Sequence, residues 1–295
     1  MKRRFAPAGE VSTVPRAKKG VGSGSVGVPR VQAVQSAIRI LWTIGQAGAR
    51  GMTLNQLAQA VELPKSTVLR LAQTLVDERL LQREEPTGIF RLGIRVFELG
   101  TLVLNTLEVP RIARRHLEWL AEQTRETVHL CVLDEGEVVY VDKIESPQVI
   151  GLFSRIGRRA PAHCTGVGKA LMAYLPADER RRLVERRPLK RYTANTITDF
   201  LQLEKELEEI RRTGIAFDRE EHEPGVRCAA APVFDLTGRV CAAVSVAVPT
   251  LRLPPGRLEE LAKLVRQATQ AISEDLGYRA PSRPSETRAA SGAQP

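Results

Sequence analysis

Polar residues that could contact nucleic acid recur within the stretch LPKSTVLRLAQTLVD. They stand three or four positions apart, so a helix would place them on one face: Ser66, Arg70, Gln73 and Asp77. Serine, arginine and glutamine can hydrogen-bond base edges in the major groove of DNA, which is wide enough to admit one helix. A carboxylate near phosphates would be repelled, and Asp77 lies at the far end. We therefore expect DNA contacts from the first half of the helix, Lys65 to Gln73.

The segment TGVGKA could bind an anion, although it fails as a nucleotide-binding loop. The pattern GxxxxGK[ST] requires glycine where His163 stands and serine or threonine where Ala170 stands. Gly166 and Gly168 nevertheless open a helix, and the unbonded N–H groups of a helix start favour a carboxylate. The alternative, that these glycines are needed only for close packing, stays open.

Cysteine and histidine could supply a nucleophile or a metal site, but their spacing does not favour either. The four cysteines stand singly, without the pairing of a zinc site or the density of a disulfide scaffold: Cys131, Cys164, Cys228 and Cys241. His163 and Cys164 are adjacent, and on an extended strand they would point to opposite faces. We expect no catalytic residue, metal or cofactor. A Cys/His or metal-dependent enzyme and a thiol-based redox-sensing regulator remain the alternatives.

The acidic stretch DREEHE is expected to be a solvated loop. Asp218 is the exception, because it ends the apolar run IAF and can face inward. It is the one acid of this stretch that we expect in a binding site.

The elements around the polar helix predict a winged helix-turn-helix domain over residues 31–93. One helix runs from Val31 to the break at Gly45 and Gly48, and a second begins at Thr53 with the capping-box pattern TLNQ. Pro64 suits the first turn of the third helix, where no N–H is lost. The runs LLQRE and GIFRLG, joined by a glycine turn, form a hairpin that serves as the wing.

Residues 94–108 read as a linker helix, and residues 109–278 as an α+β domain with a central antiparallel sheet. Short apolar runs separated by turn signals predict its strands: VHLCVLD, EVVYVDKI, VIGLF, IAFDRE, RCAAAPVFD and VCAAVSVAVP. Helices are predicted at TGVGKALMAYL, ADERRRLVERR, TDFLQLEKELEEIRRTG and about 256–276.

Composition is that of a folded, soluble protein with a charged end. The 295 residues, 43% hydrophobic, suffice for two domains, and no apolar run reaches the ~20 residues of a membrane span. No secretory signal is present, so we expect a cytoplasmic protein without membrane contact. Seven basic residues and one acid give residues 1–30 a net charge of +6 out of +10. We expect a disordered basic arm over 1–30 and a disordered tail over 279–295.

Motifs in both halves of the chain resemble the IclR (isocitrate lyase regulator) family of bacterial transcription factors. They include LPKSTVLRLAQTLVDERLLQRE, ETVHLCVLDEGEVVYVDKIESP, GRRAPAHCTGVGKALMAYLP and EEHEPGVRCAAAPVFDLTGRVCAAVSV, and the likeness covers about residues 31–278. The resemblance implies a GAF-like effector-binding domain behind the winged helix. It also implies homodimers or homotetramers on a pseudo-palindromic operator, controlling a catabolic operon as repressor or activator.

The DNA contacts expected from the residues and the resemblance together are Thr53, Lys65, Ser66, Thr67, Arg70, Gln73 and, at the wing tip, Thr87. Leu69 departs from the family, because many members carry tyrosine or histidine there. The operator preference of relatives therefore cannot be transferred.

For the effector, the resemblance implies that the amides of Gly166 and Val167 bind a carboxylate. It further implies a polar lining of Asp218, Cys228 and Ser245 and an apolar wall of Val149, Leu152, Ala160 and Val226. Ala247 stands where some members use a second serine, and the lost hydroxyl favours a less polar ligand. We expect a small organic acid with an aromatic or largely apolar body.

Overall fold

A computed structural model describes residues 30–106, 108–149, 151–152 and 154–279 of the chain. The chain divides into two compact units between Leu99 and Gly100. The expected arm, apart from Arg30, and the expected tail, apart from Arg279, lie outside the described residues.

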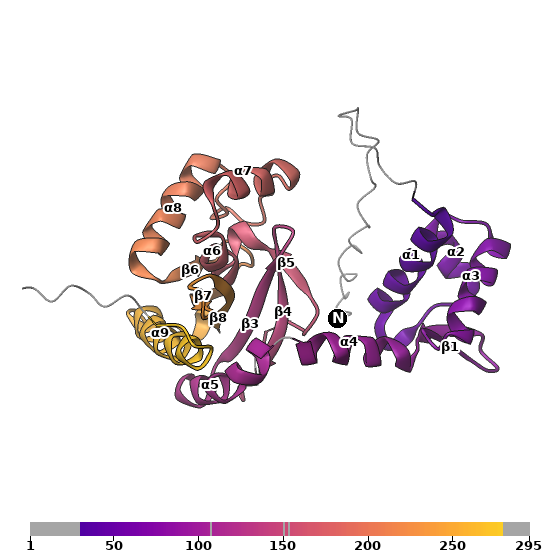
Figure 1. The fold of residues 1–295 in the computed structure, drawn as a ribbon, viewed down its shortest axis with the longest axis horizontal. Helices are drawn as coiled ribbons and strands as arrows, with labels where there is room; N and C mark the ends of the chain where they lie inside the picture. The colour runs from indigo at the N-terminus through magenta and orange to yellow at the C-terminus, as the bar shows by residue number, and fades with distance from the viewer. Residues whose placement is uncertain (1–29, 107, 150, 153, 280–295) are drawn as a thin grey trace, which may run out of the picture. The chain divides into compact units, whose positions relative to one another are not determined.

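The N-terminal unit consists of three helices followed by an antiparallel hairpin (Figure 1). The elements are α1 (Gln32–Ala47), η1 (Gly48–Arg50), α2 (Leu54–Val61), α3 (Lys65–Asp77), β1 (Leu81–Glu84) and β2 (Ile89–Leu92). This is the predicted winged helix-turn-helix, and its fold class is confirmed.

Local capping fixes where α2 and α3 begin. The Thr53 hydroxyl accepts a hydrogen bond from the Gln56 amide, and the Gln56 side chain accepts one from the Thr53 amide, which completes the predicted capping box. Pro64 is the N-cap residue just before α3, whereas the sequence predicted it within the first turn of the helix.

Buried apolar side chains hold the three helices and the hairpin in one core: Ile40, Ile44, Leu57, Val61, Val68, Ala72, Leu75, Leu81 and Phe90.

Helices α1 and α4 (Ile94–Thr106) expose large apolar side chains. On α1, Trp42 is 58% exposed, and Val34 and Ile38 lie beside it at helical spacing. On α4, Phe97 is 69% exposed. Contiguous exposed apolar side chains of this size are typical of a protein interface.

The C-terminal unit is built on a six-stranded antiparallel sheet in the order β5-β4-β3-β8-β7-β6. The strands are β3 (Thr127–Asp134), β4 (Glu137–Ile144), β5 (Arg159–Pro161), β6 (Ala216–Arg219), β7 (Val226–Phe234) and β8 (Val240–Pro249). The helices are α5 (Glu108–Thr124), η2 (Ala162–Cys164), α6 (Gly166–Met172), α7 (Ala177–Arg186), α8 (Phe200–Thr213), η3 (Thr250–Arg252) and α9 (Arg257–Asp275).

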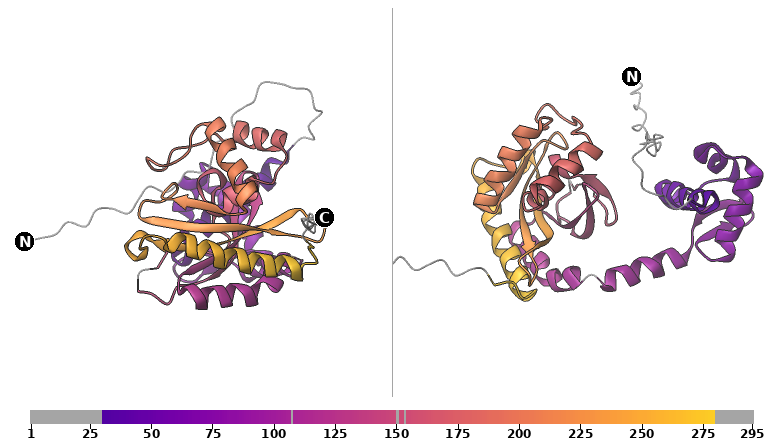
Figure 2. Two further views of the ribbon diagram at one scale, coloured as in Figure 1. Left: turned by 90° about the vertical axis from the view of Figure 1, so that its left-hand side faces the viewer. Right: turned by 45° about the horizontal axis from the view of Figure 1, so that its top comes forward.

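Helices cover both faces of this sheet and make two cores (Figures 1 and 2). On one face α5 and α9 pack against alternate residues of β3, β7 and β8. On the other face α6 and α8 pack against the strand residues that alternate with these. The alternation follows from the strand period of two, and it gives the predicted α+β architecture.

Two local predictions in this unit are wrong. The run VIGLF contains no strand at its described residues, and a three-residue strand, Arg159–Pro161, pairs with β4 instead. His163 and Cys164 lie in the short helix η2 rather than on a strand. Glycine at 151 weakens the β propensity of VIGLF, and such a short apolar run does not determine its own partner.

Candidate functional site

The polar face of α3 is exposed as predicted from its spacing. Lys65, Ser66, Arg70 and Gln73 are exposed, while Thr67 is half-buried. Leu69 is 40% exposed on the same side. Because the opposite face is fixed in the core, this face has a defined orientation on its unit.

Three of the predicted DNA contacts have side chains that already make hydrogen bonds. The Gln73 amide donates to an Asp77 carboxylate oxygen at 2.9 Å. Thr53 is engaged in the capping box, so its hydroxyl serves the start of α2. At the tip of the hairpin, the Thr87 hydroxyl donates to the carbonyl of Glu84 at 3.2 Å. These contacts orient the three residues without excluding a further partner.

In the C-terminal unit, a cavity lies between the sheet and the start of α6. We call it the sheet cavity. It brings together nine of the ten predicted effector-site residues: Leu152, Ala160, Gly166, Val167, Asp218, Val226, Cys228, Ser245 and Ala247. The remaining residue, Val149, does not line the cavity, and its side chain is fully exposed.

Strand register explains how residues distant in sequence meet in the sheet cavity. Cys228 on β7 pairs with Asp218 on β6 and with Ala247 on β8. Two residues from Ala247 on β8, and therefore on the same face, Ser245 pairs with His129 on β3. Residues paired across antiparallel strands share a face, so these rows form the floor of the cavity.

The two glycines at the start of α6 have different roles. A Cβ on Gly166 would lie 2.6 Å from the Cys228 sulfur, at the wall of the cavity. A Cβ on Gly168 would overlap the backbone of Ala162, so Gly168 is required by packing. The Thr165 hydroxyl accepts a hydrogen bond from Gly168, and the amides of Gly166 and Val167 begin the helix ahead of it. Close packing thus requires glycine at both positions, and anion binding by the amides of Gly166 and Val167 stays a prediction.

A loop between β4 and β5 closes one side of the sheet cavity. Leu152, Ser154 and Arg158 from this loop line it. The Lys143 ammonium donates to the carbonyls of Ser154 at 3.0 Å and Leu152 at 3.4 Å. His129 Nε2 lies 2.7 Å from the Ser154 hydroxyl. Lysine and histidine therefore fix the loop over the cavity.

Seven further polar or aromatic residues line the sheet cavity and were not predicted: His129, Tyr140, Ser154, Arg158, Thr165, His222 and Glu223. His129 is directly opposite Ser245, so a known strand register would have revealed it. Tyr140 lies on β4 opposite Cys131, and the other five come from positions outside the strands, whose direction depends on the course of the chain between elements. The cavity is consequently more polar than the sequence suggested.

Burial changes the proton affinity of the groups in the sheet cavity. Asp218 is buried, and burial raises the pKa of its carboxyl to about 7, partly offset by the hydrogen bond from the Glu221 amide. Burial also lowers the pKa of His129 to about 3, helped by the nearby charge of Lys143. At neutral pH His129 is an uncharged hydrogen-bonding group, while Asp218 exchanges a proton.

Lys169 forms a buried ion cluster behind the cavity wall. Its fully buried ammonium lies 2.6 Å from a Glu221 oxygen and 2.9 Å from a Glu206 oxygen. Burial alone would lower the pKa of Lys169, but the two carboxylates outweigh it and raise the pKa. The expectation that only Asp218 of the acidic stretch faces inward is therefore wrong. Glu221 is buried too, because it neutralises Lys169.

The cysteines have the properties of structural thiols. Cys131, Cys164 and Cys228 are buried, and burial raises the pKa of each thiol well above its usual range. Burial raises the pKa of Cys241 to about 11. A thiol with a raised pKa is a poor nucleophile and a slow redox sensor. His163 Nε2 donates to the carbonyl of Lys190 at 3.0 Å and not to Cys164.

Metal binding and membrane insertion find no support in the described part of the chain. Among those residues no group of three or more His, Cys, Asp or Glu side chains is arranged to hold a metal ion. No helix within the same residues has both the length and the apolar composition to cross a membrane.

Two protein-family models match the chain, one to each unit. Residues 33–85 match the IclR helix-turn-helix domain, and residues 101–274 match the bacterial transcriptional regulator IclR C-terminal domain. Together these matches extend over most of the chain.

Individual relatives agree with the family models. The HTH-type transcriptional regulator KdgR of Escherichia coli is 38% identical over 248 residues, which cover 84% of this chain and 94% of that protein. The Thermotoga maritima IclR crystal structure superimposes with a TM-score of 0.70 at 31% identity, covering 83% of this chain and 98% of that one. An IclR homolog from Microbacterium hydrocarbonoxydans, crystallised with 4-hydroxybenzoate, gives 0.74 at 26% identity, with 83% and 99% covered.

Proposed function

The chain belongs to the IclR family of DNA-binding bacterial transcriptional regulators, and we propose that a small organic acid in its sheet cavity controls how it binds a pseudo-palindromic operator. The observation that carries this proposal is the convergence in one cavity of the α6 start, Asp218 and Ser245. We propose that the operon under control is catabolic, because regulators that sense a small acid commonly serve its breakdown.

We propose that the carboxylate of the acid binds at the amides of Gly166 and Val167. These amides start α6, and a helix start favours negative charge. Cys228 and Ala247 lie on the adjoining sheet face and provide a surface for the body of the ligand.

The lining of the cavity favours an acid that carries hydroxyl or keto groups besides its carboxylate. Ala247 alone suggested an apolar or aromatic body. The structure adds His129, Ser154, Tyr140 and Arg158 to the lining, and each can form hydrogen bonds. Hydroxyl or keto groups on the ligand can form hydrogen bonds with this lining, which a wholly apolar body cannot. The relative crystallised with 4-hydroxybenzoate keeps a hydroxylated aromatic acid among the candidates.

We propose that the exposed apolar faces of α1 and α4 pair with a second copy of the chain. Val34, Ile38 and Trp42 on α1, with Phe97 on α4, offer a surface that water covers in a single copy. A two-fold dimer buries the same patch on both partners and brings two reading helices to two half-sites. Tetramers would extend the same arrangement.

The reading role of α3 can be tested on the DNA upstream of the gene for this protein. Arg70→Ala should weaken binding of the protein to that DNA about tenfold, because one base or phosphate contact is worth about 1–3 kcal/mol. Arg212→Ala, on the exposed face of α8, is the matched control and should bind like the parent protein. Fluorescence anisotropy of labelled DNA measures both. Equal affinities for the two variants would contradict a reading role for Arg70.

A further inference from the structure

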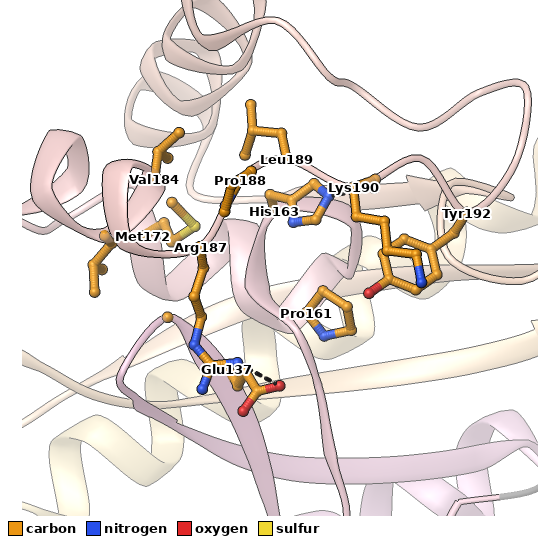
Figure 3. Close-up of a pocket in the computed structure, with 12 residues that line it drawn as sticks. Glu137, Pro161, His163, Met172, Val184, Arg187, Pro188, Leu189, Lys190 and Tyr192 are labelled. Carbon is orange, nitrogen blue, oxygen red and sulfur yellow. Dashed lines mark hydrogen bonds and ion pairs between the residues drawn. The ribbon is translucent and has the colours of Figure 1, made fainter. Parts of the chain in front are cut away.

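A second cavity lies in the C-terminal unit between α7 and the loop of residues 188–192 (Figure 3). We call it the loop cavity. It shares the segment from β5 to η2 with the sheet cavity, since Ala160 lines the sheet cavity while Pro161 and His163 line the loop cavity.

The apolar walls of the loop cavity come from three separate elements. Met172 lies at the end of α6, Leu183 and Val184 on α7, and Pro188 and Leu189 in the following loop. The loop is anchored, because the carbonyl of Lys190 accepts a hydrogen bond from the buried His163 ring. These walls can take the flat apolar body of a small molecule.

The charged side chains that line the loop cavity carry a positive excess. Arg187 forms an ion pair with Glu137 at 2.8 Å, and Glu137 forms a second ion pair with Arg159 at 3.4 Å. Lys190 also lines the cavity, and its ammonium lies 5.5 Å from the centre of the Tyr192 ring. Figure 3 shows the pair of Arg187 and Glu137 on one side and Lys190 beside Tyr192 on the other. An anionic group between them would meet two cations and one carboxylate.

Hydrogen bonds and ring contacts connect the loop cavity to the sheet cavity. The hydroxyl of buried Thr196 accepts from the Tyr192 amide at 3.0 Å and donates to the Glu221 carbonyl at 2.6 Å. The Tyr192 ring centre is 6.1 Å from that of His163 and 5.5 Å from that of His222. His222 lines the sheet cavity, so a displacement of Tyr192 would change the surroundings of a side chain in that cavity.

We propose that the loop cavity is a second binding site, for a small amphiphilic organic anion such as an aromatic carboxylate, and that its occupancy is coupled to the sheet cavity through Tyr192 and Thr196. Binding in the loop cavity stands on its own geometry, whereas the regulatory meaning of the coupling rests on the proposed function of the sheet cavity. Two sites linked by the contacts of Tyr192 and Thr196 influence each other if these residues have two positions and each ligand binds one position more tightly than the other.

Binding can be tested with 4-fluorobenzoate, followed by its fluorine NMR signal on the full chain. The experiment uses the Ala247→Leu background, in which a larger side chain reduces the sheet cavity. In this background we expect the probe still to bind in the loop cavity, at about millimolar affinity. Adding Lys190→Glu should weaken that affinity at least about tenfold, since a rim cation becomes an anion. Val184→Trp, which fills the cavity, should remove binding.

Lys263→Glu on the exposed face of α9 is the matched charge-reversal control and should leave the affinity unchanged. Circular dichroism of each variant verifies that the fold is kept. Binding that is absent, that disappears with Ala247→Leu alone, or that ignores both Lys190→Glu and Val184→Trp would overturn the site.

The coupling is read from the ring protons of His222 in the same titration. His222 does not line the loop cavity. A shift of its signals on addition of 4-fluorobenzoate to the Ala247→Leu protein therefore reports on its contact with Tyr192. We expect the shift to follow the binding curve of the probe. Unmoved His222 signals at saturation would overturn the coupling. Neither readout uses DNA or an effector, so the proposed function is tested separately.

Discussion

Asp218 occupies the place in the sheet cavity where the charge of an acid ligand would matter most. The backbone amide of Asp218 lies 3.6 Å from the Cβ position of Gly166, next to the amides proposed to bind a carboxylate. The Asp218 side chain lines the sheet cavity, so a carboxylate bound there would share a buried site with it, and two carboxylates in one buried site are costly to ionise together. We predict that Asp218 holds a proton when the acid is bound, which lets its carboxyl donate a hydrogen bond to the ligand.

The affinity for an anionic effector should consequently fall as pH rises through about 7, the pKa of Asp218. The sign follows from the raised pKa: below it Asp218 is neutral and accepts an anion, and above it binding requires proton uptake. The charged or titratable groups around Asp218 are Lys169, Glu221, His222, Cys164 and Cys228. Burial has a larger effect on the pKa of Asp218 than any of these groups. Calorimetry from pH 6 to 8.5 should show a loss approaching about tenfold per unit at the upper end. Asp218→Asn should remove the slope, and a flat profile in the parent protein would contradict the role of Asp218.

Lys169 makes a second prediction at this scale. Lys169→Met leaves Glu221 buried without its partner, which should destabilise the C-terminal unit by about 3–5 kcal/mol. Adding Glu221→Gln should recover part of the loss, because the stranded charge is gone. Lys205→Met on the exposed side of α8 is the control, with an expected change below about 0.5 kcal/mol. Denaturant unfolding measures all three, and a Lys169→Met protein as stable as the control would refute the cluster's importance.

At the scale of elements, patterns that depend on neighbours in sequence were predictable. The capping box at Thr53 and the buried face of α3 follow from spacing alone. The contents of the sheet cavity do not, because they depend on register and on loop direction. His129 comes from pairing with Ser245, and Val149 is exposed because the run around it is not a strand. The burial of Glu221 required knowing where Lys169 points, which no local pattern encodes.

Helices α1 and α4 carry the prediction on assembly. Trp42→Glu combined with Phe97→Glu should dissociate the proposed dimer, because each large side chain contributes about 1.5–3 kcal/mol when buried. Sedimentation velocity should show a shift to monomer, and affinity for the upstream DNA should fall with it. Leu201→Glu, at an exposed site on α8, is the control and should leave the assembly intact. A variant that stays dimeric would place the interface elsewhere.

At the scale of the whole molecule, we propose that an acid in the sheet cavity of one unit controls DNA binding by α3 in the other. A ligand shifts such a system only if it binds one arrangement of the assembly more tightly than another. Coupling energies of about 1–3 kcal/mol are typical, and they correspond to roughly 5–150-fold changes in affinity. The connection runs through α4, whose residues Ile94–Thr106 span the boundary between the units.

The central claim is that an acid in the sheet cavity changes DNA binding. The most direct measurement is fluorescence anisotropy of the upstream DNA with and without acids that calorimetry shows to bind the chain, starting from D-gluconate and 4-hydroxybenzoate. The account predicts a change in DNA affinity of at least about fivefold for a bound acid, abolished by Ser245→Leu in the cavity. An acid that binds the sheet cavity, loses that binding in Ser245→Leu, and yet leaves DNA affinity unchanged would contradict it.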